Sequence, residues 1–186
     1  MAIYNEVIGA SWIALIGLWT ALSIAGVRGG GRRYSPGRRL LRLAFVVVVV
    51  VLVIRYGDSV SMPSFERWPA SVAAAGAVLC VLGLAFATWA RFALGRNWGV
   101  PMALHDNPEL VTSGPYTYVR HPIYTGLLAM WIGTSLVFPL AAGAAVLFIA
   151  YCVFSARREE RDMERRFPDA YPAYKTRSKM LVPFLL

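Results

Sequence analysis

Charged residues are scarce in this sequence. They make up 16% of its 186 residues, whereas 58% of the residues are apolar. A soluble domain carries about 25% charged residues and buries its apolar side chains in one core. The apolar residues here stand in long blocks, so we expect lipid to surround many of them. Cysteine is also rare: Cys80 and Cys152 lie inside apolar blocks without a CxxC spacing, which supports neither a disulfide nor a metal site.

Acidic residues and lysine are few as well, and the net charge is +9. Arginine supplies 17 of the 19 basic residues, and it stands mainly at the ends of apolar blocks. This pattern is typical of helix anchors that face anionic headgroups. Because the basic and aromatic residues form no recognisable nucleic-acid-binding module, we expect membrane lipids and no nucleic acid as partners. Glu6, rather than a basic segment, precedes the first block, so we expect no cleavable signal.

The apolar blocks predict an all-α integral membrane protein of about five transmembrane helices. They cover residues 7–27, 40–54, 70–94 and 123–156. Six consecutive valines in the second block would favour a strand in water, but a lone strand in a bilayer leaves its backbone unpaired, so a helix is expected. Pro139 divides the last block into halves of about 16 residues, about 24 Å of helix each, which predicts a tight hairpin.

Arginine counting predicts the orientation. Six arginines lie in residues 28–42, whereas the charges in residues 55–69 are balanced. The positive-inside rule therefore places the N-terminus outside and residues 28–42 in the cytoplasm. With five spans, the polar segment 95–121 and the C-terminal tail share the cytoplasmic side, where we expect the active site. The high ratio of arginine to lysine favours a GC-rich bacterial source and hence a bacterial plasma membrane.

The first chemistry-bearing cluster surrounds the start of the fourth predicted helix. Gly114-Pro115 is a turn signal, and Pro122 suits the first turn of a helix. Arg120 and His121 then lie at a helix N-terminus, where an anion is favoured. The alternative interpretation is that Arg120 only anchors the helix and His121 only caps it.

The second cluster is the pair Glu159-Glu160, which we place at the cytoplasmic end of the fifth helix. A hairpin of the fourth and fifth helices brings this pair near Arg120 and His121. The two acidic residues then form either an ion-pair staple or a site for a cationic cofactor group. The residue types alone do not decide between these two interpretations.

Four elements in order resemble the isoprenylcysteine carboxyl methyltransferase family and its wider relatives among membrane methyltransferases, including the phospholipid methyltransferases. They are Gly114-Pro115-Tyr116, then Arg120-His121-Pro122-Ile123-Tyr124-Thr125-Gly126, then Glu159-Glu160, and then residues 167–174 in a Phe-x-x-x-Tyr-x-x-Tyr pattern. The resemblance covers about residues 95–186. Pro168 departs from the glycine that is usual at this position in the eukaryotic enzymes, so the local turn is expected to differ.

The resemblance implies a methyltransferase that uses S-adenosylmethionine on the cytosolic side, with a lipid substrate that enters from the bilayer. A loop region and a C-terminal cap would form the cofactor pocket, so residues 95–186 would be the catalytic region and residues 1–94 a three-helix scaffold. Arg120 and Glu160 would lie close to the reacting centre as catalytic residues, and Asn97 and Trp98 near the substrate. The expected cofactor-binding residues are Val111, Gly114, Tyr116, Val119, His121, Pro122, Tyr124 and Glu159.

The residue types permit more than one acceptor. The isoprenylcysteine-like carboxylate that the resemblance implies would need a cation to orient it, and Arg120 can do this with two hydrogen bonds. A thiol, hydroxyl or amine, including a phospholipid amine, would need a proton acceptor, for which Glu160 or His121 is suitable. Two alternatives to a methyltransferase stay open: an NADPH-dependent membrane reductase of the sterol type and a non-enzymatic scaffold. Oligomeric state is not predicted.

Overall fold

The computed structural model describes residues 2–27, 69–97, 109–139 and 141–182. The predicted second helix, over residues 40–54, lies outside the described residues, and so does Trp98. The elements are α1 (Ala2–Val27), α3 (Ala70–Leu94), η1 (Gly95–Asn97), η3 (Gly114–Thr117), α4 (Pro122–Val137), α5 (Ala141–Arg166) and α6 (Ala170–Arg177). The described part contains no strand, only an isolated bridge between Val119 and Lys179, so the all-helical prediction is confirmed for it.

The helix boundaries follow the apolar blocks closely. α3 coincides with the predicted block 70–94, and α4 and α5 are separated at Phe138 and Pro139. Pro122 occupies the first turn of α4, as predicted. α1 begins at Ala2 rather than at residue 7, because hydropathy marks the lipid-compatible part of a helix and not its full length. α5 continues through the charged segment to Arg166.

Three described helices are long and apolar enough to cross a membrane: Ile3–Leu22 within α1, Ala70–Leu94 and Ala141–Arg166. α4 is apolar but has only 16 residues, about 24 Å of helix against a hydrocarbon core of about 30 Å. The described residues therefore support an integral membrane protein. The count of five spans and the orientation remain predictions.

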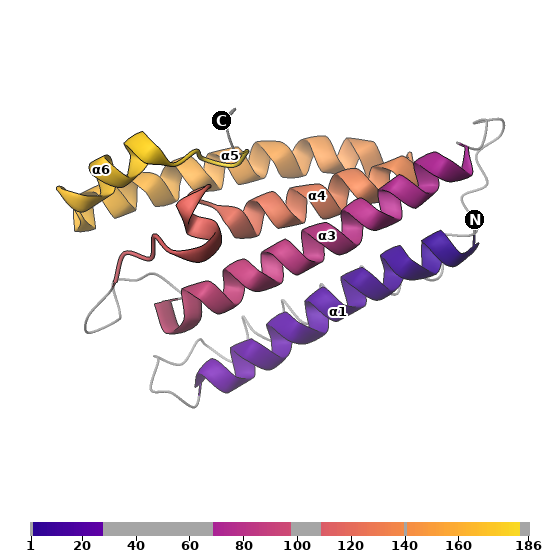
Figure 1. Cartoon of the computed structure of the whole chain (residues 1–186), viewed down its shortest axis with the longest axis horizontal. Coiled ribbons are helices and arrows are strands. Elements are labelled where there is room, and N and C mark those ends of the chain that lie inside the picture. Colours follow the sequence, from indigo (N-terminus) through magenta and orange to yellow (C-terminus); the bar gives the residue numbers. More distant parts are fainter. Residues whose placement is uncertain (1, 28–68, 98–108, 140, 183–186) are drawn as a thin grey trace. The chain divides into compact units, whose positions relative to one another are not determined.

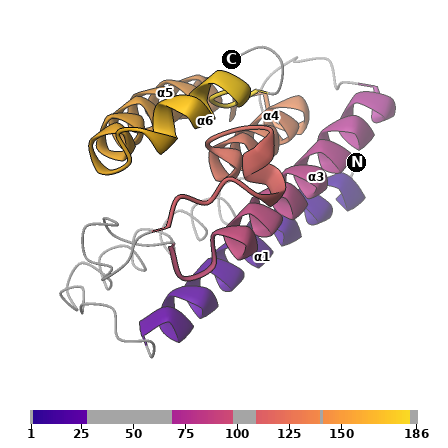
Figure 2. The ribbon, with the colours of Figure 1, turned by 60° about the vertical axis from the view of Figure 1, so that its left-hand side comes forward.

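The chain divides into two compact units, one formed by Met1–Leu15 with Trp68–Leu186 and the other by Ile16–Arg67. In the first unit α4 lies between α3 and α5, and α6 lies beside α5 (Figures 1 and 2). The first half of α1 contacts α4, because Trp12 Nε1 donates to Thr134 Oγ1 over 3.0 Å and the Trp12 ring packs edge-on against Trp131.

Glycines set the contact between α3 and α4. A Cβ atom added to Gly83 would lie 2.5 Å from the carbonyl oxygen of Gly126, and one added to Gly126 would lie 2.6 Å from the carbonyl oxygen of Gly83. Gly76 and Gly133 meet about two helical turns further along. A Cβ atom added to Gly76 would lie 2.6 Å from the carbonyl oxygen of Gly133. The two backbones touch directly, which is how helices pack closely where no hydrophobic effect drives them together.

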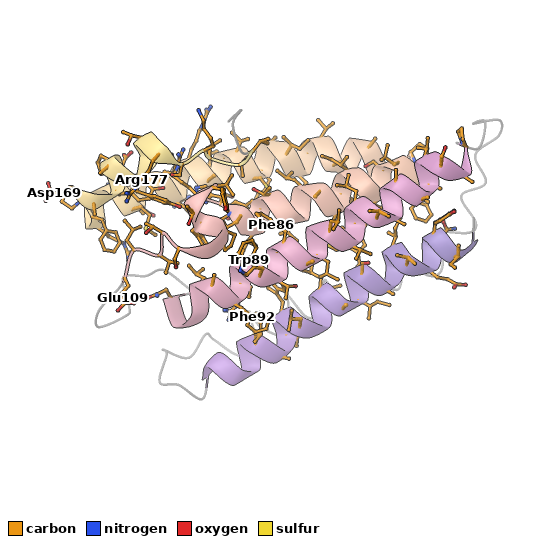
Figure 3. The ribbon with its side chains drawn as sticks, viewed as in Figure 1. Phe86, Trp89, Phe92, Glu109, Asp169 and Arg177 are labelled. Atoms are coloured by element: carbon orange, nitrogen blue, oxygen red, sulfur yellow. The ribbon has the colours of Figure 1, made fainter. Side chains whose placement is uncertain are left out.

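Several large apolar side chains of α3 are exposed. Trp89 is 49% exposed and Phe92 is 58% exposed in the isolated chain (Figure 3). Val78 and Leu82 are similarly exposed. Exposed apolar side chains along a helix of this hydropathy fit a lipid environment.

Candidate functional site

The C-terminal segment holds the first cluster in place. Residues 178–182, which we call the C-terminal strap, run beside the segment before α4. Arg120 N donates to Lys179 O over 2.7 Å, and His121 N donates to Met180 O over 3.1 Å. Thr125 Oγ1 donates to Leu181 O over 2.5 Å. The strap therefore fixes the backbone from which the arginine and histidine side chains project.

A second tie fixes the turn η3 before that segment. Gly114 begins η3 with a φ of +61°, a conformation that favours glycine. Tyr174 Oη on α6 donates to Tyr116 O over 2.5 Å. Burial raises the pKa of Tyr174 to about 12, so its hydroxyl keeps the proton that it donates at neutral pH.

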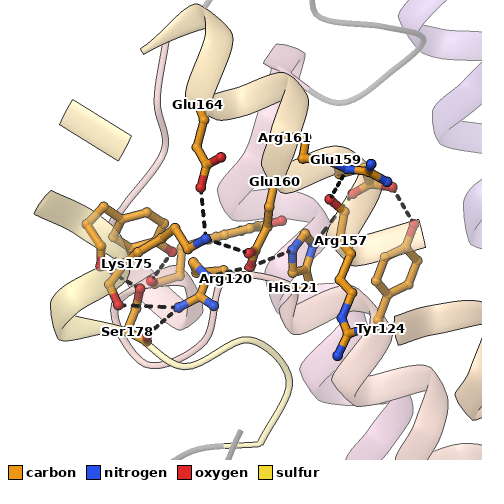
Figure 4. Close-up of polar contacts among 12 residues, drawn as sticks. Arg120, His121, Tyr124, Arg157, Glu159, Glu160, Arg161, Glu164, Lys175 and Ser178 are labelled. Carbon is orange, nitrogen blue, oxygen red and sulfur yellow. Dashed lines mark hydrogen bonds and ion pairs between the residues drawn. The ribbon is translucent and has the colours of Figure 1, made fainter. Parts of the chain in front are cut away.

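Arg120 and Glu160 form the centre of the site (Figure 4). Arg120 Nε lies 2.6 Å from Glu160 Oε1, and the two side chains are 10% and 9% exposed. Arg120 Nη1 also donates to the carbonyl oxygens of Ser178 and Lys175. Lys175 Nζ lies 3.1 Å from Glu160 Oε2 and 2.8 Å from Glu164 Oε1. Both oxygens of Glu160 therefore face cations.

Glu159 has a different environment from Glu160. Its side chain is 50% exposed, and Tyr124 Oη donates to Glu159 Oε1 over 2.5 Å. His121 Nδ1 lies 3.5 Å from Glu159 Oε2, and the His121 ring stacks on Tyr124 with centroids 5.7 Å apart. Of the two acidic residues, Glu159 is the one that solvent or a ligand can reach.

His121 lies between the two carboxylates. Burial alone would lower the pKa of His121, but Glu159 and Glu160 raise it by more, so the pKa lies above its ordinary value. Nε2 lies 3.5 Å from Glu160 Oε1, which is an ion-pair distance. In the described part of the chain this buried nitrogen has no hydrogen-bond partner. A bound group could satisfy it.

An open pocket of about 400 Å³ lies between the end of α3 and the segment that leads to η3. Asn97 and Val111 both line it, and Asn97 Oδ1 accepts from Glu109 N over 3.5 Å. Glu109 marks this end of the molecule in Figure 3. The other lining residues are Ala93, Leu94, Gly95, Glu109, Leu110, Thr112 and Ser113.

The predicted meeting of the two clusters is confirmed, because α4 and α5 bring Arg120 and His121 against Glu159 and Glu160. Of the other predicted site residues in the described part, Gly114 and Tyr116 belong to η3, and Tyr124 donates to Glu159. Val111 and Asn97 line the pocket, whereas Val119 and Pro122 are fully buried next to the strap. The functional roles of all these residues stay predictions.

The sequence predicted no site role for three residues of the cluster: Lys175, Ser178 and Thr125. Each depends on how the C-terminal segment folds back, which no local pattern predicts. One signal was present, since Lys175 and Lys179 are the two lysines of an arginine-rich chain and lie four residues apart. Every basic residue outside this segment is an arginine, so the two lysines set the segment apart from the rest of the chain.

Comparison with known proteins shows where the chain belongs. The family model described as phospholipid methyltransferase matches residues 72–170, which include both clusters. Protein-S-isoprenylcysteine O-methyltransferase of Rattus norvegicus is 31% identical over 120 residues, which are 61% of this chain and 42% of that protein. Methanethiol S-methyltransferase 1 of Bradyrhizobium diazoefficiens is 38% identical over 82 residues, which are 41% of this chain and 27% of that protein.

A third relative is the cobalt-zinc-cadmium resistance protein CzcN of Cupriavidus metallidurans, which is 30% identical over 145 residues, or 75% of this chain and 61% of that protein. The matches thus span less than two thirds of the length of each of these three relatives. No solved structure matches the chain significantly.

Proposed function

The chain belongs to the phospholipid methyltransferase family, and from this premise we propose that it is a membrane enzyme that moves a methyl group from S-adenosylmethionine to a lipophilic acceptor. The observation that supports the proposal most is the half-exposed Glu159 carboxylate, held by Tyr124 and His121 at the open end of the α4–α5 hairpin. The names of the relatives from Rattus and Bradyrhizobium describe methyl transfer to different atoms.

The residues present fit this cofactor. S-adenosylmethionine supplies a methyl group that its positive sulfonium has already activated. The exposed Glu159 carboxylate favours a nearby positive charge, and His121 Nε2 is a buried nitrogen that a ligand could satisfy. The open pocket of about 400 Å³ beside η3 is lined by Asn97 and Val111 and by no residue of the Arg120–Glu160 cluster, so the fit rests on Glu159 and His121.

We assign Arg120 and Glu160 a positioning role. Methyl transfer from an activated donor depends chiefly on alignment of the two reactants. Glu160 was predicted to lie at the reacting centre, but both its oxygens face cations and its side chain is nearly buried. Arg120 likewise joins α5, α6 and the strap. The pair would hold the side chains of Glu159 and His121 at fixed positions relative to each other.

The acceptor would come from the bilayer, and the site would face the cytoplasm with the N-terminus outside. The apolar faces of the helices support access from lipid. An isoprenylcysteine-like carboxylate is one acceptor consistent with the family, and a thiol or a phospholipid amine is another.

Isothermal titration of the purified full chain in detergent micelles tests the proposal. We expect both S-adenosylmethionine and its demethylated product to bind, and Glu159→Gln to weaken binding by about tenfold, the effect of roughly 1.4 kcal/mol. Gly143→Ala, on an open face of α5, is the control and should bind normally. If neither ligand binds while NADPH raises the melting temperature, the chain is a reductase and the proposal is wrong.

A further inference from the structure

A row of aromatic rings runs along the α4–α5 hairpin from the end that carries Glu159. Tyr124 on α4, whose hydroxyl donates to Glu159, lies close enough to Tyr151 on α5 to interact with it electrostatically. The Tyr151 ring stacks on Phe148 with centroids 6.0 Å apart, and the Phe148 ring lies 5.9 Å from that of Trp131 on α4. We call these four residues, Tyr124, Tyr151, Phe148 and Trp131, the aromatic row. The row leads from the candidate site towards the turn between the two helices.

The aromatic row follows the helix axes and does not stay at one level of the membrane. From Glu159 to Phe148, α5 covers about 16 Å, and from Tyr124 to Trp131, α4 covers about 10 Å. α5 is long and apolar enough to cross a membrane. Aromatic residues that only anchor a helix gather at the membrane–water interfaces. A row that continues about halfway through a hydrocarbon core of about 30 Å is therefore not explained by anchoring.

The rings of the row are open to a ligand and already held in place. Tyr151 is 57% exposed, and Phe148 and Trp131 are half-buried, so part of each side chain stays open in the described part. Contacts between the rings, and the edge-on packing of Trp12 against Trp131, fix their positions before anything binds. An apolar surface that is already ordered costs less free energy to bind against. Because the rings follow one another singly, one apolar chain is sufficient to cover them.

The end of the row at Glu159 is charged. Arg157 and Arg161 stand one on either side of Glu159 along α5, and both are exposed (Figure 4). Charges of both signs at one end, followed by a line of rings, match an amphiphile that has a polar head group and one apolar chain. The chain would lie on the rings while the head group stays beside Glu159.

From this arrangement we propose that the aromatic row binds the apolar chain of the methyl acceptor, and that only a long chain reaches Phe148. The proposal rests on the proposed function and deepens it, because it names lipids with one long chain as the acceptor class and the residues that bind the chain. An extended chain gains roughly 1.2 Å per bond, as an extended backbone does, so about 13 bonds reach from Glu159 to Phe148. A six-carbon chain therefore ends short of Phe148, whereas a fourteen-carbon chain reaches it.

Competition by two alcohols of different length tests the proposal on the purified full chain in detergent micelles. Hexanol and tetradecanol carry the same uncharged head group, so only the chain differs. The assay follows transfer of a labelled methyl group from S-adenosylmethionine to lipid extract from the host, and the half-inhibiting amount of each alcohol is expressed per mole of detergent. We expect tetradecanol to inhibit at least about tenfold more strongly than hexanol, because each further buried methylene favours binding.

Phe148→Ala should reduce the advantage of tetradecanol over hexanol by about fivefold, the scale of one partly buried apolar contact. Inhibition by hexanol should stay nearly unchanged, because the short chain ends before Phe148. Phe154→Ala is the matched control, since Phe154 is also on α5, is 63% exposed and lies about 120° around the helix from Phe148. This control should keep the native advantage. Phe148→Leu, which keeps most of the side-chain volume, should fall between the native chain and Phe148→Ala.

The outcomes separate this proposal from the proposed function. Each advantage is a ratio measured within one protein, so a smaller folded fraction in a variant cancels. If tetradecanol has no advantage over hexanol in the native chain, or if the Phe148 variants and Phe154→Ala change that advantage equally, the proposal is overturned while the proposed function stands, because label is still transferred. If the folded native chain transfers no label to any lipid fraction, the proposed function fails and this proposal fails with it.

Discussion

Arg120 Nε lies 2.6 Å from Glu160 Oε1, although the two residues are 40 positions apart in the sequence. This contact ties the start of α4 to the charged end of α5. Lys175 contacts the other oxygen of Glu160 and brings α6 to the same point. Three elements therefore converge on one carboxylate, and the exposed Glu159 lies next to it.

Arg120→Ala should destabilise the protein by roughly 3 kcal/mol or more, because it leaves a buried carboxylate with fewer compensating charges. The melting temperature in detergent micelles measures the effect. Glu160→Ala should cause a similar loss. The double variant Arg120→Met/Glu160→Leu replaces both charges by apolar side chains and should lose less than the two single losses combined. Strictly additive losses would contradict a coupled pair.

Gly83→Ala should disrupt the contact of α3 with α4, because the new Cβ atom would lie 2.5 Å from Gly126 O and 2.8 Å from Met130 N. Backbone atoms cannot move aside as a flexible side chain can, so the helices must separate. We expect a loss of about 1–3 kcal/mol, as for overpacked interiors, visible as a lower melting temperature. Gly143→Ala meets nothing within 4 Å and should leave stability unchanged or slightly higher. Equal behaviour of the two variants would refute the close approach.

Tyr174→Phe removes the hydroxyl that donates to Tyr116 O at 2.5 Å. We expect a loss of about 1–2 kcal/mol, because a buried carbonyl loses its partner, and weaker cofactor binding, because η3 precedes the Arg120 segment. Tyr118→Phe is the matched control, since Tyr118 is 57% exposed. Calorimetry and melting temperature together check the result, and an unchanged cofactor affinity in Tyr174→Phe would argue against a role for the turn.

His121 should make stability depend on pH. Burial lowers the pKa of His121, but Glu159 and Glu160 raise it more, so the folded chain binds the proton more tightly than the unfolded chain. The stabilising contribution is therefore complete below about pH 6.5 and is lost as the pH rises through the higher folded pKa. The melting temperature should fall over that interval in the native protein and fall less in His121→Gln. The same pH dependence in both proteins would contradict this assignment.

The sequence predicts the helices of the described part well, because lipid imposes long apolar runs and Pro139 cannot continue a helix. It also predicts that Arg120 and His121 meet Glu159 and Glu160, since a hairpin with a short turn leaves its open ends together. Pro122 at the first turn of α4 follows from the missing N–H of proline.

The roles of the two adjacent acids could not be separated from sequence. Successive residues on a helix point about 100° apart, so one of Glu159 and Glu160 faces the protein and the other faces outward, but which one depends on how α5 is rotated. The strap is equally unpredictable, because Val119 pairs with Lys179 through contacts between distant segments. Lys175 and Ser178 therefore emerge only from the folded chain.

The most direct test of the central claim is transfer of a labelled methyl group from S-adenosylmethionine by the purified full chain to lipid extract from its own host. We predict that label enters a lipophilic product, that Gly143→Ala transfers it normally, and that Glu159→Gln transfers much less. If the folded protein transfers no label to any lipid fraction, or if Glu159→Gln transfers as much as the native chain, the account of this site is contradicted.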